Sequence, residues 1–367
     1  MYKNKKDKKS LFKTIDKHFL IGVLVLTSFG IIAIADASAP IASRNFSDKL
    51  FFARQQFYFA LIGFFLLIVA SNINYKIWQR FGPLLFLLNL FFLFLILIPG
   101  FGISALGAKR RIDLGFFSFQ PSEFLKITLS MYIAKVAEKG KGIFSYLLPL
   151  LISAFLIVLQ PDLGTALIIV GIGLTQMFVA GINLFQFFIL VLGGGGITTL
   201  LILFSDYRKE RLLTFLEQTR DPLGKSYHIR QILLALGSGG FWGVGLGNSK
   251  QKYLFLPETA TDSIFAVLAE EFGFMGSVVI ILIFSYFIYR GYKIIVDAPD
   301  TFSRIFSLGI ISWIGGQTIL NIAAMSALVP LTGVPIPFIS YGGSSLVSLL
   351  FACGILLNIS KYGKKIR

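Results

Sequence analysis

The sequence predicts an all-α integral membrane protein with ten transmembrane helices. The chain of 367 residues is 55% hydrophobic and only 14% charged, which is too apolar for a soluble domain of this size. Long runs without charged residues recur along it, and a helix needs about 20 mostly apolar residues to cross the hydrocarbon core. Both ends are basic, as expected when an even number of helices leaves both termini in the cytoplasm. These observations exclude a soluble enzyme.

Apolar runs locate the first five predicted spans, which lie within residues 19–35, 55–75, 81–108, 122–138 and 142–161. The fourth is the least apolar, because Lys126 and Lys135 lie within it. We expect both lysine side chains to extend towards opposite membrane surfaces. The run 163–205 is long enough for two further spans, separated at Gly181-Ile182-Asn183.

The last three spans include the two anomalies of the sequence. The eighth, between Ser263 and Tyr289, contains Glu270 and Glu271, which we expect to be paired, protonated or facing a polar cavity. The ninth and tenth share residues 305–360 and are separated by a segment, 330–345, that contains three prolines and a Gly-Gly-Ser-Ser run. Irregular backbone at membrane depth is tolerated only when it is buried in protein or lines a cavity, although a simple extracellular turn is the alternative.

The distribution of basic residues predicts the orientation and the division of the chain. Lysine-rich tails at 1–18 and 361–367 are expected in the cytoplasm, with spans at 19–205 and 263–360. This orientation accounts for most of the net charge of +16, so nucleic acid is not an expected partner. The lysine cluster at the start lacks a short apolar region with a cleavage site, which predicts a retained first span.

Residues 206–262 form a long loop that this orientation places outside, between spans seven and eight. Glu210–Thr219 and the residues after Ser226 have amphipathic patterns and predict two helices at the membrane interface. A glycine-rich run at 237–247 follows them. It has no preceding strand, so a dinucleotide-binding role is weakly supported.

Several chemistries are excluded by the residue types available. His18 and His228 are expected on opposite faces, so neither a histidine-paired nucleophile nor a multi-histidine metal site is expected. The single cysteine, Cys353, allows no internal disulfide. Gly224-Lys225-Ser226 resembles the end of a phosphate-binding loop but lacks its first glycine. Carboxylates and basic groups at the outer surface remain as candidates.

The basic candidates are Lys109, Arg110 and Arg111, which follow the third span, and Lys126, which follows Gln120-Pro-Ser-Glu. Guanidinium groups match the oxygens of phosphate or pyrophosphate in bidentate fashion. The alternative is that these side chains extend to lipid head groups.

The acidic candidates are Asp262 and Glu258, which directly precede the eighth span. A partly desolvated carboxylate near a basic cluster has the raised basicity that a general base needs. The alternative for Asp262 is a structural role as the cap of the helix that follows.

Three motifs resemble one family in order and in place over essentially the whole chain. They are Gly107-Ala-Lys-Arg-Arg-Ile with Gln120-Pro-Ser-Glu-Phe-Leu-Lys126, Leu256-Pro-Glu-Thr-Ala-Thr-Asp-Ser-Ile-Phe-Ala with Glu270-Glu-Phe-Gly273, and Pro335-Ile-Pro-Phe-Ile-Ser-Tyr-Gly-Gly-Ser-Ser345. They closely resemble the SEDS family, the shape, elongation, division and sporulation group that contains RodA and FtsW.

The resemblance implies a peptidoglycan glycosyltransferase in the bacterial cytoplasmic membrane that polymerises lipid II with a class B penicillin-binding transpeptidase and other divisome or elongasome proteins. The family's essential aspartate corresponds to Asp262, and the substrate-binding candidates are Lys109, Arg110, Lys126, Glu258, Ser344 and Ser345. No cofactor is certain, but Glu258 is a candidate ligand for Mg²⁺ or Mn²⁺. The stretch before Glu258 and the residues before Pro335 slightly favour an FtsW-like member.

Three residues depart from the family pattern: Arg111 replaces a usual Trp, Ala260 a usual His and Ser263 a usual Phe. We expect Asp262 to deprotonate the acceptor sugar while Lys109, Arg110 and Lys126 stabilise the departing pyrophosphate. Two other classes remain open. A lipid flippase or transporter would place charges and broken helices near the bilayer midplane, and a scaffold would only activate a transpeptidase.

Overall fold

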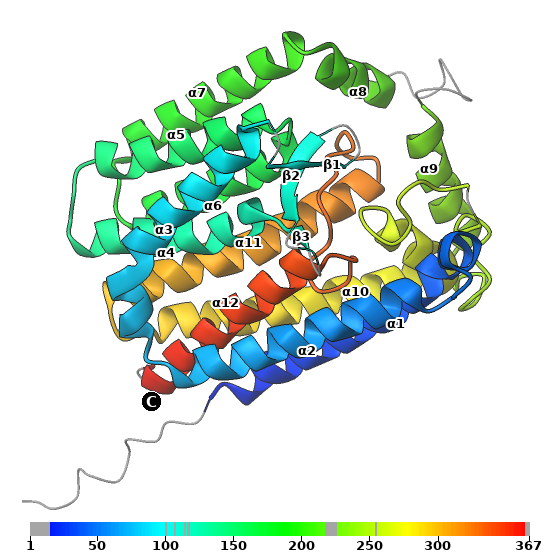
Figure 1. Ribbon diagram of the computed structural model, residues 1–367, viewed down its shortest axis with the longest axis horizontal. Coiled ribbons are helices and arrows are strands. Elements are labelled where there is room, and N and C mark those ends of the chain that lie inside the picture. The colour runs from blue at the N-terminus through cyan, green and yellow to red at the C-terminus, as the bar shows by residue number, and fades with distance from the viewer. Residues whose placement is uncertain are drawn as a thin grey trace, which may run out of the picture.

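The computed structural model describes residues 15–99, 101–105, 108–113, 115, 118–216, 226–253 and 255–363, with side chains throughout except at 103–105, 108, 109, 113 and 207. Helices account for most of this part of the chain, and three short strands form one small sheet (Figure 1). The helices are α1 (Lys17–Phe46), α2 (Phe51–Asn72), α3 (Tyr75–Leu97), α4 (Pro121–Glu138), α5 (Phe144–Leu159), α6 (Leu163–Val179), α7 (Leu184–Leu203), α8 (Asp206–Leu216), α9 (Tyr227–Gly239), α10 (Ile264–Val296), α11 (Thr301–Met325) and α12 (Gly343–Tyr362).

The described helices confirm the predicted class of all-α membrane protein. Seven of them are long and apolar enough to cross a membrane: α1, α2, α3, α7, α10, α11 and α12. The apolar helices α5 and α6 are shorter, at 16 and 17 residues. Helix α4 has 18 residues and contains Glu123, Lys126 and Lys135. These three occupy the positions of the remaining predicted spans, and the total of ten stays a prediction.

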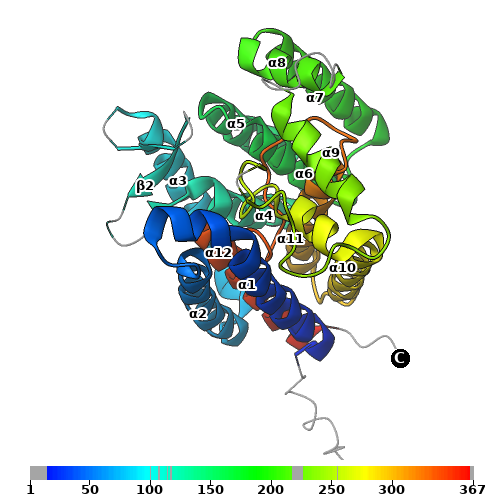
Figure 2. The same cartoon turned by 90° about the vertical axis from the view of Figure 1, so that its right-hand side faces the viewer.

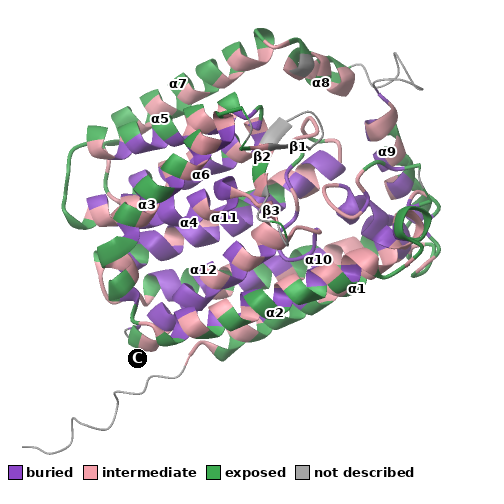
Figure 3. Ribbon diagram, viewed as in Figure 1, coloured by how far each residue is buried: buried purple, intermediate pink, exposed green. Residues whose placement is uncertain are grey.

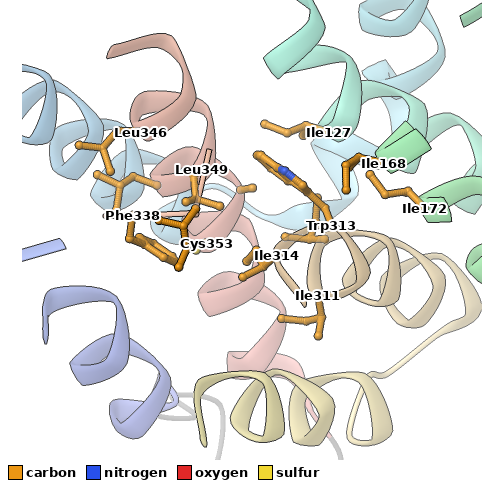
Figure 4. Packing of buried hydrophobic residues seen from close by; sticks show 14 of the residues in the cluster. Ile127, Ile168, Ile172, Ile311, Trp313, Ile314, Phe338, Leu346, Leu349 and Cys353 are labelled. Atoms are coloured by element: carbon orange, nitrogen blue, oxygen red, sulfur yellow. The ribbon is translucent and has the colours of Figure 1, made fainter. Parts of the chain in front are cut away.

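The core lies between α4, α11 and α12, where buried residues concentrate (Figure 3). Trp313 of α11 is 1% exposed and packs among isoleucines from α4 and α6, close to Cys353 of α12 (Figure 4). Large apolar side chains on the outside of the bundle are exposed, as expected where lipid is the solvent. Figure 2 shows α7 and α8 on one side of the bundle and α1 and α2 on the other. None of the residues of α7 is buried.

The third span begins earlier than the sequence predicted. Residues 81–108 were expected to contain it, but α3 begins at Tyr75 and ends at Leu97, before Pro99, which lacks the N–H that a continuing helix would use. The chain then forms an antiparallel sheet of β1 (Ile103–Ala105), β2 (Ala108–Asp113) and β3 (Ser118–Phe119). The sheet was not predicted, and its middle strand carries Arg110.

Both helices predicted in the loop of residues 206–262 are present, and one of them begins earlier than predicted. Helix α9 begins at Tyr227, directly after Ser226, as predicted, although the Ser226 side chain makes no cap hydrogen bond. Helix α8 begins at Asp206, four residues before the predicted start, and the last predicted residues, 217–219, lie outside the described part.

The glycine-rich run packs against a break in α10. Gly273 has φ 66° inside α10, and Gly243 has φ 84°, a region that favours glycine. The backbone nitrogen of Val244 donates to the carbonyl of Glu270 at 3.1 Å, and that of Phe274 donates to the carbonyl of Gly240 at 2.9 Å. A β-carbon on Gly243 would lie 2.0 Å from the Glu271 carbonyl oxygen. The glycines therefore permit close packing of two backbone segments.

Candidate functional site

Asp262 lies in the turn that precedes α10. The cap position of α10 is Ser263, and no side-chain cap hydrogen bond is made there. The Asp262 backbone carbonyl accepts a hydrogen bond from Asn321 Nδ2 at 2.9 Å. No described residue donates a hydrogen bond to its carboxylate, so a structural role as a helix cap is not supported.

The surroundings of Asp262 raise the pKa of its carboxyl group from 3.8 to about 7. Desolvation by burial is the largest cause, although the side chain remains partly accessible. The negative charges of Glu258 and Asp162 also raise the pKa, while Arg211 and Arg110 lower it. A carboxylate with a pKa near 7 matches the requirement for a general base at neutral pH.

Arg110 extends from β2 to the turn between α5 and α6. Its Nε donates to the Gln160 carbonyl at 3.2 Å and its Nη2 to the Pro161 carbonyl at 2.6 Å. Its Nη1 lies 3.6 Å from Asp162 Oδ2, and Asp162 in turn caps α6 by accepting from the Thr165 nitrogen at 3.0 Å. The guanidinium is thus held in one orientation while its side chain stays 36% exposed.

Two charged residues of this site were missed by the sequence reasoning. Asp162 follows the fifth predicted span and was treated only as part of a span boundary. Arg211 lies on α8, and its Nη1 donates to the Leu331 carbonyl at 3.1 Å. Both residues lie near the ends of predicted helices, and that position was the only indication of a role in the site. Nothing in the sequence specified that their charges would act on Asp262.

Glu258 shapes the turn that carries Asp262. It adopts φ 55°, and its carbonyl accepts from the backbone nitrogens of Thr261 at 3.1 Å and Ser263 at 3.2 Å. Its carboxylate accepts from Thr261 Oγ1 at 2.8 Å. Within the described residues, no three His, Cys, Asp or Glu side chains gather as metal ligands. The divalent cation at Glu258 stays a prediction, and no step below depends on it.

The proline-rich segment lies against this turn. Ser340 Oγ donates to the Thr261 carbonyl at 2.6 Å, and the Tyr341 nitrogen donates to the Ala260 carbonyl at 2.8 Å. Gly333 has φ 70°, and a β-carbon there would lie 3.4 Å from Asp262 Oδ2. Val334, Ile336, Phe338 and Ile339 are buried. The segment is therefore packed into the protein beside the carboxylate and is not a simple surface turn.

Lys126 lies inside the bundle. It is 1% exposed, and its Nζ lies 2.8 Å from Glu123 Oε1 and 3.2 Å from Gln317 Oε1. The ammonium also lies 4.7 Å from the centre of the Trp313 ring. Gln317 Nε2 donates to the Pro335 carbonyl at 2.7 Å, which links this buried group to the proline-rich segment. Contact between Lys126 and substrate stays a prediction, because its described contacts are all internal.

Of the other predicted substrate-binding residues, the structure describes the side chains of Ser344 and Ser345 but not that of Lys109. Ser344 Oγ donates to the Ser118 carbonyl at 2.7 Å and accepts from the Gln120 nitrogen at 3.2 Å, which fixes β3 to the start of α12. The Ser345 carbonyl accepts from Ser348 Oγ at 2.9 Å. The Lys109 side chain lies outside the described part of the chain, although its backbone pairs with Ser104.

One departure from the family pattern has a partner in the structure. Ser263 Oγ lies 2.9 Å from His228 Nε2, and His228 comes from α9. Burial, followed by the positive charge of Arg211, lowers the pKa of His228 to about 4, so the imidazole is neutral at pH 7. From the sequence, His228 had no expected role beyond the exclusion of a histidine-paired nucleophile and a multi-histidine metal site, whereas the structure places it against the residue next to Asp262.

Of the alternatives expected for Glu270 and Glu271, the structure shows an ion pair for Glu271 and a set of hydrogen bonds for Glu270. Glu271 Oε1 lies 2.8 Å from Lys252 Nζ, which also contacts Asp36 Oδ1 at 2.7 Å. Glu270 accepts from Ser249 Oγ, from Ser238 Oγ at 3.1 Å, and from the backbone nitrogens of Lys250 at 3.2 Å and Gln251 at 3.3 Å. These contacts hold the loop onto α10.

The fold and the site together define a multi-pass membrane protein with a carboxylate of raised pKa, Asp262, within the electrostatic range of Arg110 and Arg211. The family model FtsW/RodA/SpoVE, described as "Cell cycle protein", matches residues 17–365, and the chain belongs to this family. The predicted SEDS resemblance is therefore confirmed.

The curated relatives are similar over nearly their whole length. Stage V sporulation protein E of Bacillus subtilis (strain 168) is 42% identical, covering 95% of this chain and 98% of the relative. Probable peptidoglycan glycosyltransferase FtsW of Trichlorobacter lovleyi is 41% identical, covering 94% and 93%. These relatives agree with the FtsW-like tendency.

Solved structures with 24% identity show the same fold. A chain from "Structural coordination of polymerization and crosslinking by a peptidoglycan synthase complex" has a TM-score of 0.79 and covers 96% of this chain and 99% of its own. The rod shape determining protein RodA of Thermus thermophilus has a TM-score of 0.70, covering 94% and 96%.

Proposed function

We propose that this protein is a peptidoglycan glycosyltransferase that polymerises lipid II into glycan strands. The observation that carries the proposal is Asp262, whose pKa is raised to about 7 and which lies in the electrostatic range of Arg110 and Arg211. The family assignment and the relatives named peptidoglycan glycosyltransferase support the same activity. The similarity to FtsW and the sporulation protein favours a role in division-type wall synthesis.

In the proposed reaction, Asp262 removes the proton from the 4-hydroxyl of the acceptor GlcNAc. The hydroxyl oxygen then bonds to the anomeric carbon of the donor MurNAc as the bond from that carbon to the pyrophosphate breaks. Undecaprenyl pyrophosphate leaves with the bonding electrons. Arg110, oriented by Asp162 and two carbonyls, compensates the charge that develops on the leaving group, with Lys109 beside it in sequence.

The proposal includes the topology and the partners. The protein spans the bacterial cytoplasmic membrane ten times, both termini are cytoplasmic, and the 206–262 loop faces outwards. A class B penicillin-binding transpeptidase would crosslink the strands, together with other divisome or elongasome proteins. The solved complex, whose title joins polymerization to crosslinking, supports a partner of this kind.

The test is polymerisation of purified lipid II by the wild type, Asp262→Ala and Asp262→Asn. Loss of a general base costs about 10² to 10⁴ in rate, so both variants should make no long strands. Asp48→Asn is the control, since Asp48 is an aspartate that, among the described residues, forms an ion pair with Arg54 alone. Normal strands from Asp262→Asn would exclude the assignment.

The same proteins distinguish the two alternative classes. A flippase would move labelled lipid II across liposomes whether or not Asp262 is present. A scaffold would be inactive in polymerisation even as the wild type, and would only stimulate a transpeptidase.

A further inference from the structure

A cavity of about 490 Å³ opens beside the end of α1. The polar residues that line it are Asp36, Ser43, Arg44, Lys49, Lys252 and Tyr253. They come from α1, from the turn between α1 and α2, and from the segment that follows the glycine-rich run. In Figure 1 that segment and the end of α1 lie on the same side of the molecule.

The length of α1 places this cavity at head-group level. The helix has 30 residues, which is about 45 Å at 1.5 Å per residue, whereas the hydrocarbon core is about 30 Å thick. The predicted first span ended at residue 35, but α1 continues to Phe46. Arg44, in its last turn, therefore extends beyond the hydrocarbon on the face that carries Asp262.

The charges of the cavity are not balanced among themselves. Lys252 is paired with two carboxylates, Asp36 and Glu271, at 2.7 and 2.8 Å, so one positive and two negative groups leave a net charge of −1 there, to which Arg44 and Lys49 add +2. Asp48, the carboxylate next to Lys49, is paired with Arg54. Among the described residues, neither Arg44 nor Lys49 has an ion-pair partner. Two exposed cations therefore border a polar cavity, on a face where short loops usually carry few basic residues.

We propose that this cavity binds the phosphate or pyrophosphate head of a membrane lipid. Arg44 and Lys49 supply the positive charge, and the hydroxyl group of Ser43 supplies a hydrogen-bond donor. Arg44 offers a planar fork to two phosphate oxygens, and Lys49 offers a point charge. The chemistry selects an anionic head group attached to a lipid chain, since the cavity lies where lipid phosphates lie.

The cavity is joined to the Asp262 turn by a direct contact. Thr259 Oγ1 donates to the Ala37 carbonyl at 3.2 Å, one residue after Asp36. If the proposed function holds, glycan polymerisation requires two lipid-linked substrates at the same face, and this cavity would hold the pyrophosphate of the second. That assignment rests on the proposed function, whereas the anion site itself does not.

Photo-crosslinking tests the site without requiring turnover. p-Benzoylphenylalanine would replace Tyr253, which is 58% exposed at the cavity, in the full chain in phosphatidylcholine nanodiscs. We expect it to crosslink radiolabelled farnesyl pyrophosphate. The same photoprobe replacing Tyr292, which is 57% exposed on α10, should give only background.

Charge reversal provides the decisive comparison. The double substitution Arg44→Glu and Lys49→Glu should reduce crosslinking at position 253 at least about tenfold, because it replaces attraction by repulsion. Lys250→Glu is the matched control, since Lys250 is exposed in the same segment but does not line the cavity. Equal crosslinking in all three proteins, or an equal loss in both variants, would overturn the proposal. Arg44→Gln with Lys49→Gln provides a milder pair if the reversed protein does not fold.

Competition identifies the source of the phosphate. Displacement by undecaprenyl pyrophosphate but not by phosphatidylglycerol would assign the cavity to a substrate-like lipid. Equal displacement by phosphatidylglycerol would assign it to a phospholipid, and both results support the anion site. The crosslink should persist in Asp262→Asn protein, so a failure of the proposed glycosyl transfer is distinguishable from a failure of this site.

Discussion

Asp262 and Glu270 lie eight residues apart at the start of α10, yet the structure treats the two carboxylates in opposite ways. Glu270 accepts hydrogen bonds from two serines and two backbone nitrogens. The Asp262 carboxylate receives none from the described residues, although burial and two nearby acids raise its pKa to about 7. A buried carboxylate that accepts several hydrogen bonds helps to hold the fold together, whereas a carboxylate without hydrogen-bond donors is available for proton transfer.

The largest effect is expected for Asp262→Asn, which should lower polymerisation by about 10³-fold or more while leaving the fold intact. In the wild type, kcat/KM should increase as pH rises through about 7, because the base must be deprotonated. Because the folded-state pKa lies above the usual 3.8, ionisation destabilises the folded protein increasingly as pH rises towards about 7. Asp262→Asn should therefore melt at the same temperature as the wild type or higher at pH 8. A marked loss of thermal stability would contradict this contrast.

The opposite result is expected for Glu271→Ala. This change leaves Lys252 paired with Asp36 and removes the acceptor of the Ser249 backbone N–H, and an unsatisfied buried hydrogen-bond donor costs about 1–3 kcal/mol. The melting temperature in detergent should fall, while the activity of the protein that remains folded should change little. A variant with normal stability but no polymerisation would instead make Glu271 part of the chemistry.

A backbone change tests the same region without removing charge. Gly243→Ala should destabilise the protein by about 1–3 kcal/mol, because φ is 84° and the new β-carbon would meet the Glu271 carbonyl at 2.0 Å. Gly237→Ala is the control, since no atom lies within 4 Å of its β-carbon position. Thermal melts of the two variants should differ, and equal melting temperatures would show that the close packing has no energetic role.

The smallest effect concerns the hydrogen bond beside Asp262. His228→Gln keeps a polar side chain opposite Ser263, but glutamine differs from histidine in length and shape, so the hydrogen bond to Ser263 is displaced. We expect about a three- to tenfold decrease in kcat with KM nearly unchanged. Because the pKa of His228 is lowered to about 4, the pH dependence above pH 6 should be the same in both proteins. His18→Gln is the control, because His18 lies at the start of α1, and it should leave kcat and KM unchanged. A shifted pH profile in His228→Gln would show that the histidine acts by charge.

Some features were predictable because they depend on local composition. Seven described helices have the apolar length to cross a membrane, and α9 begins after Ser226 as expected. The ion pair of Glu271 and the hydrogen bonds of Glu270 agree with the expected cost of an isolated charge at that depth. The sheet was missed, because β1 lies inside the apolar run 81–108, whose pattern does not distinguish the end of a span from a short surface strand, and β2 begins where that run ends.

The motifs identified Arg110, Glu258 and Asp262 as candidates, but not the contacts among them. Asp162, Arg211 and His228 come from three different helices, and only the packing of those helices places them around Asp262. Lys126 has the same charge as Arg110, yet it points into the bundle towards Glu123 and Gln317. The direction of a side chain on a helix depends on its neighbours in space, which the spacing along the chain does not specify.

Apolar run lengths and long motifs are properties of the chain alone, so they were enough to identify a multi-pass membrane protein of the FtsW/RodA family. Which charges are neutralised and which stay available depends on how the helices pack. Lys252 and Lys126 are paired inside the protein, while Arg44 and Lys49 remain at a cavity and Asp262 keeps a raised pKa. The reason is physical, since the free energy of a charge depends on the burial and partners that packing brings to it.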